Sequence, residues 1–277
     1  MSVTLARPTS AVLRRLRRWW AVFAIYFQDG IAYRASGLIW ITTDVVTAVT
    51  MPLVWASAAK GGYIQGFSAG DFVVYYLSML MIASFVTSHI MWELATEIRE
   101  GQFSTFLVRP VGFIEFTFFR NLSWRLLRPV LFLPFFLLLL WAYRGFLQNV
   151  SLNLGWGFWA SLVLGHLVSF FFVVAMSMLA LFVQEASSIF ELYYFPMLFL
   201  SGQVFPVSLL PEWARRLTHL FPFYFTSGAP TEILIGRVPD SAVPGILWAQ
   251  IGWIALCAVA AKVLWSRGLR HYTGVGM

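Results

Sequence analysis

The sequence predicts an all-α integral membrane protein in which six transmembrane helices form one domain over residues 1–277. Of the 277 residues, 60% are hydrophobic and only 11% are charged, whereas a soluble domain is about half apolar and a quarter charged. The mean hydropathy is +0.76, and a soluble fold of this length could not bury so much apolar surface. Apolar segments separated by polar turns set the predicted number of spans.

The first predicted element is a helix over residues 10–34 that lies in the membrane surface. Leu13, Leu16 and Trp20 recur at spacings of three and four and so share one helical face, which Phe23 and Phe27 extend. The arginines between residues 14 and 18 fall largely on other faces, and a basic amphipathic helix of this kind lies among lipid headgroups. A basic tail followed by a short buried helix is the alternative.

The six spans are recognised by their length and their low charge. The segment 72–92 contains no charged residue, and at about 1.5 Å per residue it crosses a hydrocarbon core of roughly 30 Å. Gly157 and Gly165 would let the fourth span approach a neighbour closely. Arg125 and Arg128 are expected at the entrance of the third span. The spans are predicted at residues 37–59, 72–92, 122–143, within 145–184, at 187–202 and at 243–264.

The distribution of basic residues orients these spans in the membrane. An even number of spans puts both termini on one side, and that side holds fourteen of the nineteen Lys and Arg residues. Since cytoplasmic loops carry an excess of Lys and Arg, we expect both termini in the cytoplasm of a plasma membrane, in a bacterium the inner membrane. The net charge of +7 is thereby explained without nucleic acid as a partner. The fourteen residues are Arg7, Arg14, Arg15, Arg17, Arg18, Arg34, Arg99, Arg109, Arg120, Arg125, Arg128, Lys262, Arg267 and Arg270.

Two segments between the spans are unusual. Residues 93–110, on the cytoplasmic side, predict a helical extension of the second span, a break at Gly101, a short helix and a stop at Pro110. Residues 203–242, on the external side, are interrupted by prolines, too broken for a straight span and too apolar for a solvated loop. A re-entrant or membrane-resting helical hairpin fits both properties.

Motifs for catalysis or metal binding are absent from the sequence. There is no Gly-Lys dipeptide, which excludes a phosphate-binding loop of the G-x-x-x-x-G-K-[ST] type, and there is no H-E-x-x-H motif. The single cysteine, Cys257, cannot form an internal disulfide or a cysteine metal cluster. His89 and His166 fall within predicted spans and are expected to be packing residues. We therefore expect no catalytic residue and no metal ligand in this chain.

Three motifs, in order along the chain, carry a resemblance to a known family. The segment Glu97-Ile-Arg-Glu-Gly-Gln-Phe-Ser-Thr-Phe-Leu-Val-Arg-Pro110 resembles the first intracellular loop of ABC-2 type transporter permeases. Leu200-Ser-Gly-Gln-Val-Phe-Pro206, with Phe221-Pro-Phe-Tyr224 after it, resembles the segment that follows the fifth span of that family. His271-Tyr-Thr-Gly-Val-Gly276 is similar to its C-terminal motif. The resemblance covers nearly the whole chain.

This resemblance implies the membrane subunit of an ABC exporter that pairs with a second permease, as a homodimer or heterodimer, and with two cytoplasmic ATPase subunits. It implies export of a drug, lipid or peptide, with ATP and Mg²⁺ bound by the ATPase and no cofactor in this chain. It also implies that residues 93–110 form a cytoplasmic coupling loop that moves spans two and three. The residues expected to take part are Glu97, Arg99, Glu100, Gly101, Gln102 and Phe103. The alternative is that these charges only solvate the loop.

Charged residues inside a membrane cost roughly 2.5–3.5 kcal/mol on insertion scales, so each needs a partner or a function. Asp44 lies within the first span, and we expect it to pair with Arg125 or Arg128 at similar depth. A contact with substrate is the alternative for Asp44.

Two other functional classes compete with the exporter. An ion-gradient-driven secondary transporter would have internal repeats, helices broken at mid-membrane and intramembrane ionisable residues, and here only Asp44 is a fair candidate. A non-catalytic membrane scaffold or an intramembrane enzyme is the second, and the enzyme would need a buried catalytic constellation.

Overall fold

The computed structural model describes residues 11–59, 61–109, 111–147, 150–183 and 185–272. Within these ranges the chain is helical, with one isolated β-bridge between Ile64 and Phe67. The element η4 is a π-helix and the other η elements are 3-10 helices. In chain order the elements are α1 (Ala11–Ala32), α2 (Arg34–Ala59), α3 (Ala69–Val86), α4 (Met91–Arg99), α5 (Gln102–Leu107), α6 (Phe113–Ala142), η1 (Arg144–Phe146), α7 (Trp156–Ser177), η2 (Met178–Leu181), α8 (Ser187–Leu200), η3 (Val207–Leu209), α9 (Glu212–His219), η4 (Tyr224–Gly228), α10 (Ala229–Leu234) and α11 (Val243–His271).

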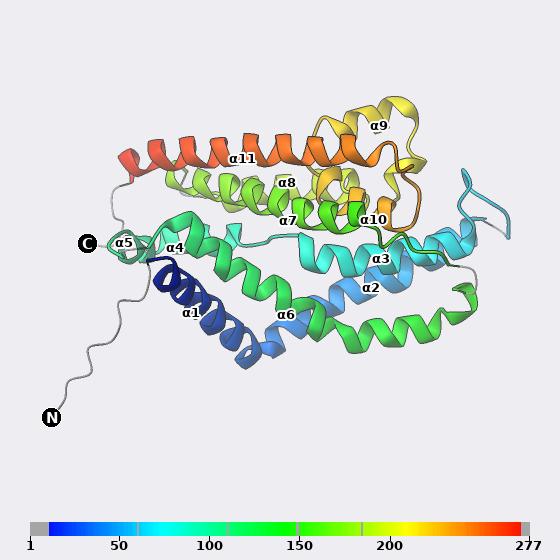
Figure 1. Ribbon diagram of the computed structural model, residues 1–277, viewed down its shortest axis with the longest axis horizontal. Coiled ribbons are helices and arrows are strands. Elements are labelled where there is room, and N and C mark those ends of the chain that lie inside the picture. The colour runs from blue at the N-terminus through cyan, green and yellow to red at the C-terminus, as the bar shows by residue number, and fades with distance from the viewer. Residues whose placement is uncertain (1–10, 60, 110, 148–149, 184, 273–277) are drawn as a thin grey trace.

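The long helices run lengthwise through the molecule (Figure 1). The beginning of α1, the short helix α5 and the end of α11 lie at one end, and α9 and the segment between α2 and α3 lie toward the other. Both ends of the described chain therefore lie at the same end of the bundle, which is the arrangement that an even number of spans requires.

Four helical segments are long and apolar enough to cross a membrane: Ala69–Arg99, Phe113–Ala142, Trp156–Leu181 and Val243–His271. Two shorter apolar helices, Val45–Ala59 and Ser187–Leu200, occupy the places of predicted spans one and five. The 14 residues of α8 extend only about 21 Å at 1.5 Å per residue. The chain is thus a multi-pass membrane protein, and its total of six spans stays a prediction.

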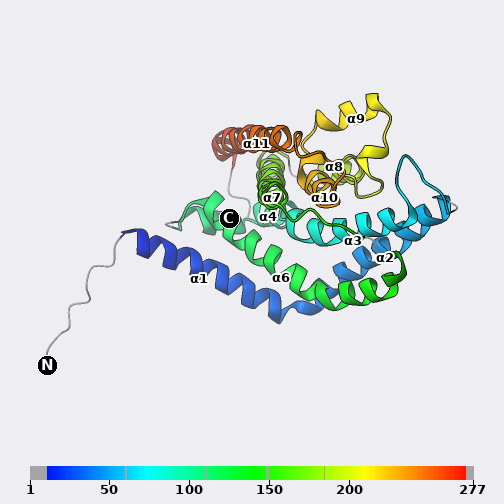
Figure 2. The same ribbon diagram turned by 45° about the vertical axis from the view of Figure 1, so that its right-hand side comes forward.

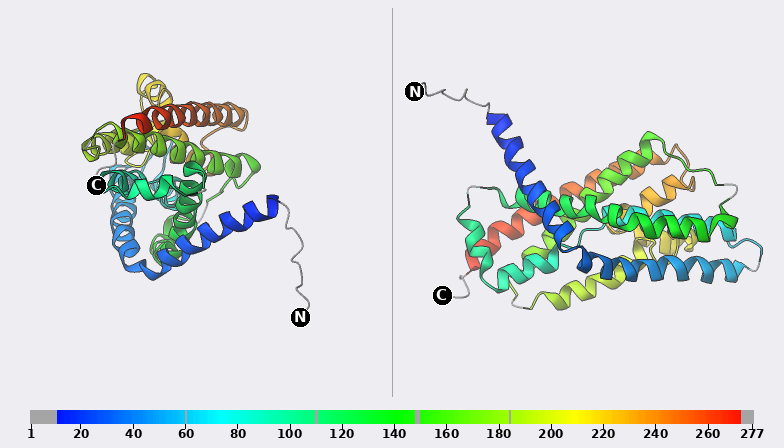
Figure 3. Two further views of the ribbon diagram at one scale, coloured as in Figure 1. Left: turned by 90° about the vertical axis from the view of Figure 1, so that its left-hand side faces the viewer. Right: turned by 90° about the horizontal axis from the view of Figure 1, so that it is seen from below.

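Helix α1 packs obliquely along α6 and leans away from the rest of the bundle (Figures 2 and 3). Trp19 stacks on Phe119 of α6 with ring centroids 5.2 Å apart, and a Cβ added at Gly30 would meet Leu127 at 2.6 Å. Leu16 and Trp20 of the predicted apolar face are exposed, whereas Phe23 and Phe27 of the same face are half-buried. That geometry suits a helix resting on lipid, although its position in a membrane stays a prediction.

Helix α6 begins at Phe113, so Arg125 and Arg128, which we expect at the entrance of the third span, lie well inside the helix. The point at which α6 enters the membrane stays a prediction. Hydropathy detects only the apolar half of this helix. Its first turns are held by packing instead, since Phe113 and Thr117 are buried.

The predicted second span, residues 72–92, lies within the apolar segment Ala69–Arg99, and this segment is interrupted. The helix stops at Val86 and resumes as α4 at Met91. Side chains of neighbouring helices bond the backbone in the gap: Arg125 donates to the Thr87 carbonyl, and the Ser88 N–H donates to Ser169 Oγ at 2.9 Å. Irregular backbone is tolerated in a membrane protein where it is buried and satisfied in this way.

The segment 203–242 is helical, and its two halves differ. Helix α9 is largely exposed, whereas residues 222–234 are buried in the bundle. The carbonyl of Phe225 accepts a bond of 2.8 Å from Gln250 of α11, and a Cβ at Gly165 of α7 would lie 2.4 Å from the Thr226 carbonyl oxygen. Gly165 therefore permits the close approach that was predicted for the fourth span, and the partner is this buried segment.

Candidate functional site

The candidate site is the turn between α4 and α5, which lies at the end of the bundle that holds both chain ends (Figure 1). Helix α4 ends after Arg99, and Gly101 adopts a φ of +75° before α5 begins at Gln102. This left-handed conformation disfavours residues with a Cβ, so glycine is the natural residue at the reversal. The predicted break at Gly101 and the short helix after it are confirmed.

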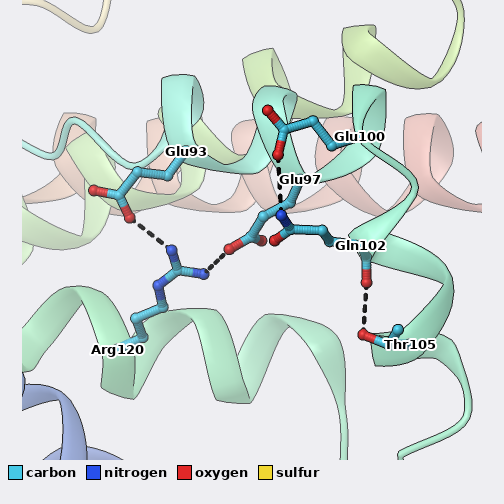
Figure 4. A network of polar contacts seen from close by, with 6 residues as sticks. All are labelled: Glu93, Glu97, Glu100, Gln102, Thr105 and Arg120. Carbon is cyan, nitrogen blue, oxygen red and sulfur yellow. Dashed lines mark hydrogen bonds and ion pairs between the residues drawn. The ribbon is translucent and has the colours of Figure 1, made fainter.

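Arg120 of α6 joins two carboxylates of α4 (Figure 4). Its Nη1 donates to Glu97 Oε1 at 2.6 Å and its Nη2 donates to Glu93 Oε2 at 2.8 Å. The guanidinium also lies 5.3 Å from the centre of the Tyr26 ring of α1. One arginine side chain, only 16% exposed, thus connects α1, α4 and α6.

The pKa of the Tyr26 hydroxyl is affected both by burial and by the Arg120 guanidinium. Burial raises its pKa, while the Arg120 guanidinium acts in the opposite direction. Nearby, Arg15 of α1 forms an ion pair with Glu115 in the first turn of α6. Helix α1 is therefore joined by an ion pair to the same region as the turn.

Beyond these internal contacts, the turn presents an exposed polar surface. Gln102 Nε2 donates to Glu100 Oε2 at 3.0 Å, and Thr105 Oγ1 donates to the Gln102 carbonyl at 2.7 Å (Figure 4). Val108, just after α5, is 84% exposed. We call this the turn surface, and its members, all exposed, are Arg99, Glu100, Gln102, Thr105, Val108 and Arg109. The predicted stop at Pro110 lies outside the described residues.

Phe103 is the predicted site residue that faces inward. It is 2% exposed and contacts Phe113 of α6, Trp265 of α11 and Tyr272, with ring centroids 5.6, 5.5 and 5.4 Å away. Phe113 and Trp265 stack on each other at 4.4 Å. The Phe103 side chain therefore packs α5 against α6 and α11 and is too buried to contact another protein.

A cavity of about 610 Å³ opens beside the turn. It lies between α4, the segment from η2 to the start of α8, and the end of α11. Its charged and titratable lining residues are Arg99, Glu185, His271 and Tyr272, and Leu181 and Phe182 supply apolar surface.

The predicted intramembrane charge pairing involves a second region, away from the turn. Arg125 is only 2% exposed and donates to the Thr87 carbonyl at the break between α3 and α4. His166 Nδ1 lies 3.3 Å from the Val86 carbonyl oxygen, in keeping with a packing role. The side chain of Asp44 lies outside the described part of the structure, so its pairing with Arg125 or Arg128 stays a prediction.

Sequence reasoning missed Arg120 as the centre of the site. One signal was available: Glu93 and Glu97 lie four residues apart on one helical face, where two like charges repel unless a cation stands between them. Nothing in the sequence indicated which arginine supplies that cation. Among the described residues, no group of three or more His, Cys, Asp or Glu side chains is placed to hold a metal ion.

Comparison with known protein families matches residues 44–276 to the family described as ABC-2 family transporter protein. The matched range runs from within α2 to beyond the end of α11, so it includes the α4–α5 turn and the segment 203–242. This match confirms the resemblance drawn from the sequence motifs. No curated protein matches the chain.

Proposed function

Because this chain belongs to the ABC-2 family of transporter membrane proteins, we propose that it is the permease subunit of an ATP-driven exporter. In this proposal it moves a hydrophobic or amphipathic substrate, a drug, lipid or peptide, out of the cytoplasm. The observation that carries the proposal is the α4–α5 turn: an exposed polar surface on a short helix whose other face is fixed to α6 and α11.

The proposed energy source is a separate ATPase subunit. The sequence lacks the glycine-lysine pair of a phosphate-binding loop, so ATP and Mg²⁺ are assigned to the partner and no cofactor to this chain. Two ATPase subunits and a second permease, identical or similar to this one, complete the proposed transporter. In this proposed assembly the partner ATPase subunits hydrolyse ATP.

The proposed topology has six spans, with α2 and α8 as the first and the fifth. Both termini and the turn surface face the cytoplasm, in a bacterium across the inner membrane. Support comes from the basic residues, fourteen of nineteen of which precede the first span, lie between the second and third spans, or follow the sixth.

The predicted site residues then divide into two roles. Arg99, Glu100 and Gln102 are exposed, and they are assigned the contact with the ATPase. Glu97, Gly101 and Phe103 are assigned the shape of the turn: Glu97 holds Arg120, Gly101 allows the reversal and Phe103 anchors α5.

The test is a pull-down of the tagged protein from its native membrane in mild detergent, followed by mass spectrometry. Recovery of a soluble protein with a phosphate-binding loop, and its loss when Glu100 is replaced by lysine, would support the exporter. Recovery of this chain alone, with no ATPase at any detergent concentration that keeps it folded, would overturn it.

One observation favours a second candidate, a secondary transporter driven by an ion gradient. That class uses helices interrupted within the membrane beside ionisable residues, and the break at Thr87–Ile90 lies against Arg125 and His166. The same pull-down separates the two candidates, because a secondary transporter needs no ATPase.

A further inference from the structure

The aromatic contacts of Phe103 reach a helix that is distant in sequence from the turn. Trp265 lies near the end of α11 and Tyr272 follows directly after it, and both touch Phe103. Ser104 Oγ and the Tyr272 hydroxyl lie 2.9 Å apart and form a hydrogen bond. Helix α5 is therefore fastened to the end of α11 by two aromatic contacts and one polar contact.

Helix α11 is the most direct rigid connection from this point to the far end of the molecule. It runs without interruption for 29 residues, about 44 Å at 1.5 Å per residue, from Val243 to His271. Its proline lies in the first turn, where proline is compatible with a straight helix.

The two helices next to the turn in sequence are less suited to carry a displacement. The backbone between α4 and α3 is interrupted from Thr87 to Ile90, so α4 is no rigid extension of α3. Helix α6 contains Pro129 and Pro134 in its interior and bends along its length (Figure 1). A displacement of α5 is therefore poorly transmitted to α3, because the backbone is broken before α4, and poorly transmitted along α6, because that helix is bent.

We propose that Phe103 passes the displacement of α5 directly to α11, through Trp265 and Tyr272, so that α11 is the span that the ATPase moves first. This inference rests on the proposed function. It differs from the expectation drawn from the sequence, in which the coupling loop moves spans two and three. Phe103 and Trp265 are thereby positioning residues, which act by transmitting movement and touch neither ATP nor substrate.

The chain supplies matched reporter sites for a test. Gly245 lies in the first turn of α11, and Gly145 lies in η1, three residues after the end of α6. A Cβ at either position would meet no atom within 4 Å. A cysteine at each, in a Cys257→Ala background, reports movement of the outer ends of α11 and α6. The measurement is the labelling rate by a membrane-impermeant maleimide in the reconstituted transporter, without nucleotide and with Mg-ATP and vanadate.

A matched pair of variants tests the α11 path against the α6 path. Phe103→Leu removes the ring that touches Trp265 and Tyr272, together with its contact with Phe113 of α6. Phe106→Leu removes a ring whose aromatic partners, Phe113 and Phe116, both belong to α6, so it controls for the loss of contacts with α6. Leucine keeps most of the apolar volume in each variant, which favours folding. Trp265→Phe is the conservative control: it alters the packing of α11 but keeps an aromatic ring against Phe103, so a loss of signal from altered packing alone would also appear in this variant.

We expect Mg-ATP and vanadate to change the labelling rate of Gly245→Cys several-fold. This change should persist in Phe106→Leu and in Trp265→Phe, and it should be lost in Phe103→Leu. A change at Gly145→Cys with none at Gly245→Cys would overturn this inference and leave the proposed function standing. So would a change at Gly245→Cys that Phe103→Leu does not reduce. No nucleotide effect at either position, together with failure to bind an ATPase, would overturn both.

Discussion

Arg120 Nη1 lies 2.6 Å from Glu97 Oε1, and this bond fixes α4, the helix before the turn, to α6. Glu97 is thereby paired within the chain, whereas Glu100, three residues on, is exposed, and among the described residues its carboxylate accepts from the neighbouring Gln102 side chain. Two glutamates that looked equivalent in the sequence thus have different roles, and charge reversal should distinguish them.

Glu100→Lys should reduce the ATPase stimulation of the assembled transporter and leave its melting temperature unchanged, because this exposed side chain bonds only the adjacent Gln102 side chain among the described residues. Glu97→Lys should lower both, since it puts a second cation against Arg120, where a charge-assisted bond contributes about 1.5–3 kcal/mol before screening by solvent. ATPase rate and thermal unfolding in detergent are the two measurements. An unchanged melting temperature in Glu97→Lys would contradict the internal role of Glu97.

A serine hydroxyl in α7 satisfies one backbone N–H in the break between α3 and α4. Ser169→Ala removes the acceptor of the Ser88 N–H, and a buried donor left without its partner costs about 1–3 kcal/mol. Thermal unfolding should show this loss. The control is Ser177→Ala in the same helix, where the buried hydroxyl only bonds the carbonyl of Val173 one turn earlier, so its removal should change little. Equal effects of the two substitutions would contradict this account.

Gly165 and Gly252 both lie inside long helices, and alanine should have opposite effects at the two positions. At Gly165 the added Cβ would lie 2.4 Å from the Thr226 carbonyl oxygen, and such overpacking costs about 1–3 kcal/mol. At Gly252 it meets nothing within 4 Å, so the lower backbone entropy of alanine should stabilise α11 by about 0.5–1 kcal/mol. Melting temperatures of the two variants test the prediction, and a tolerated Gly165→Ala would contradict the close packing.

Glu232, in the buried part of the segment 203–242, should make stability depend on pH. Its carboxylate accepts bonds from the Ser208 N–H at 3.0 Å and the Tyr224 hydroxyl at 2.9 Å. Burial nevertheless raises its pKa above the ordinary 4.5, while the Ser208 and Tyr224 bonds and Arg215 act in the opposite direction. The folded protein therefore holds this proton more tightly than the unfolded chain, and the stability that it contributes below pH 4.5 is lost as the pH rises through the raised pKa.

Glu232→Gln should consequently gain melting temperature relative to the unsubstituted protein as the pH rises from acidic to neutral. Glu212→Gln on α9 is the control with the opposite sign, because bonds from Arg216 and Arg215 lower the pKa of that carboxyl. Its effect should be small, since the ion pairs are exposed. A constant difference between Glu232→Gln and the unsubstituted protein at all pH values would contradict the assignment.

The sequence by itself determined the membrane class, because composition and hydropathy are sums over residues and need no contacts. It also determined the reversal at Gly101, since a left-handed backbone selects glycine locally, and the family, since the order of motifs is a property of the chain. Local chemistry was sufficient for each of these.

Only the tertiary structure decided which groups meet. The helix break at Thr87–Ile90 contains neither proline nor glycine, and it exists because side chains of α6 and α7 bond the backbone there. The bridge from Arg120 to α4 and the contact of Phe103 with Trp265 join residues far apart in the chain. Such contacts depend on how helices pack, and hydropathy and helical periodicity carry no information about which helices become neighbours.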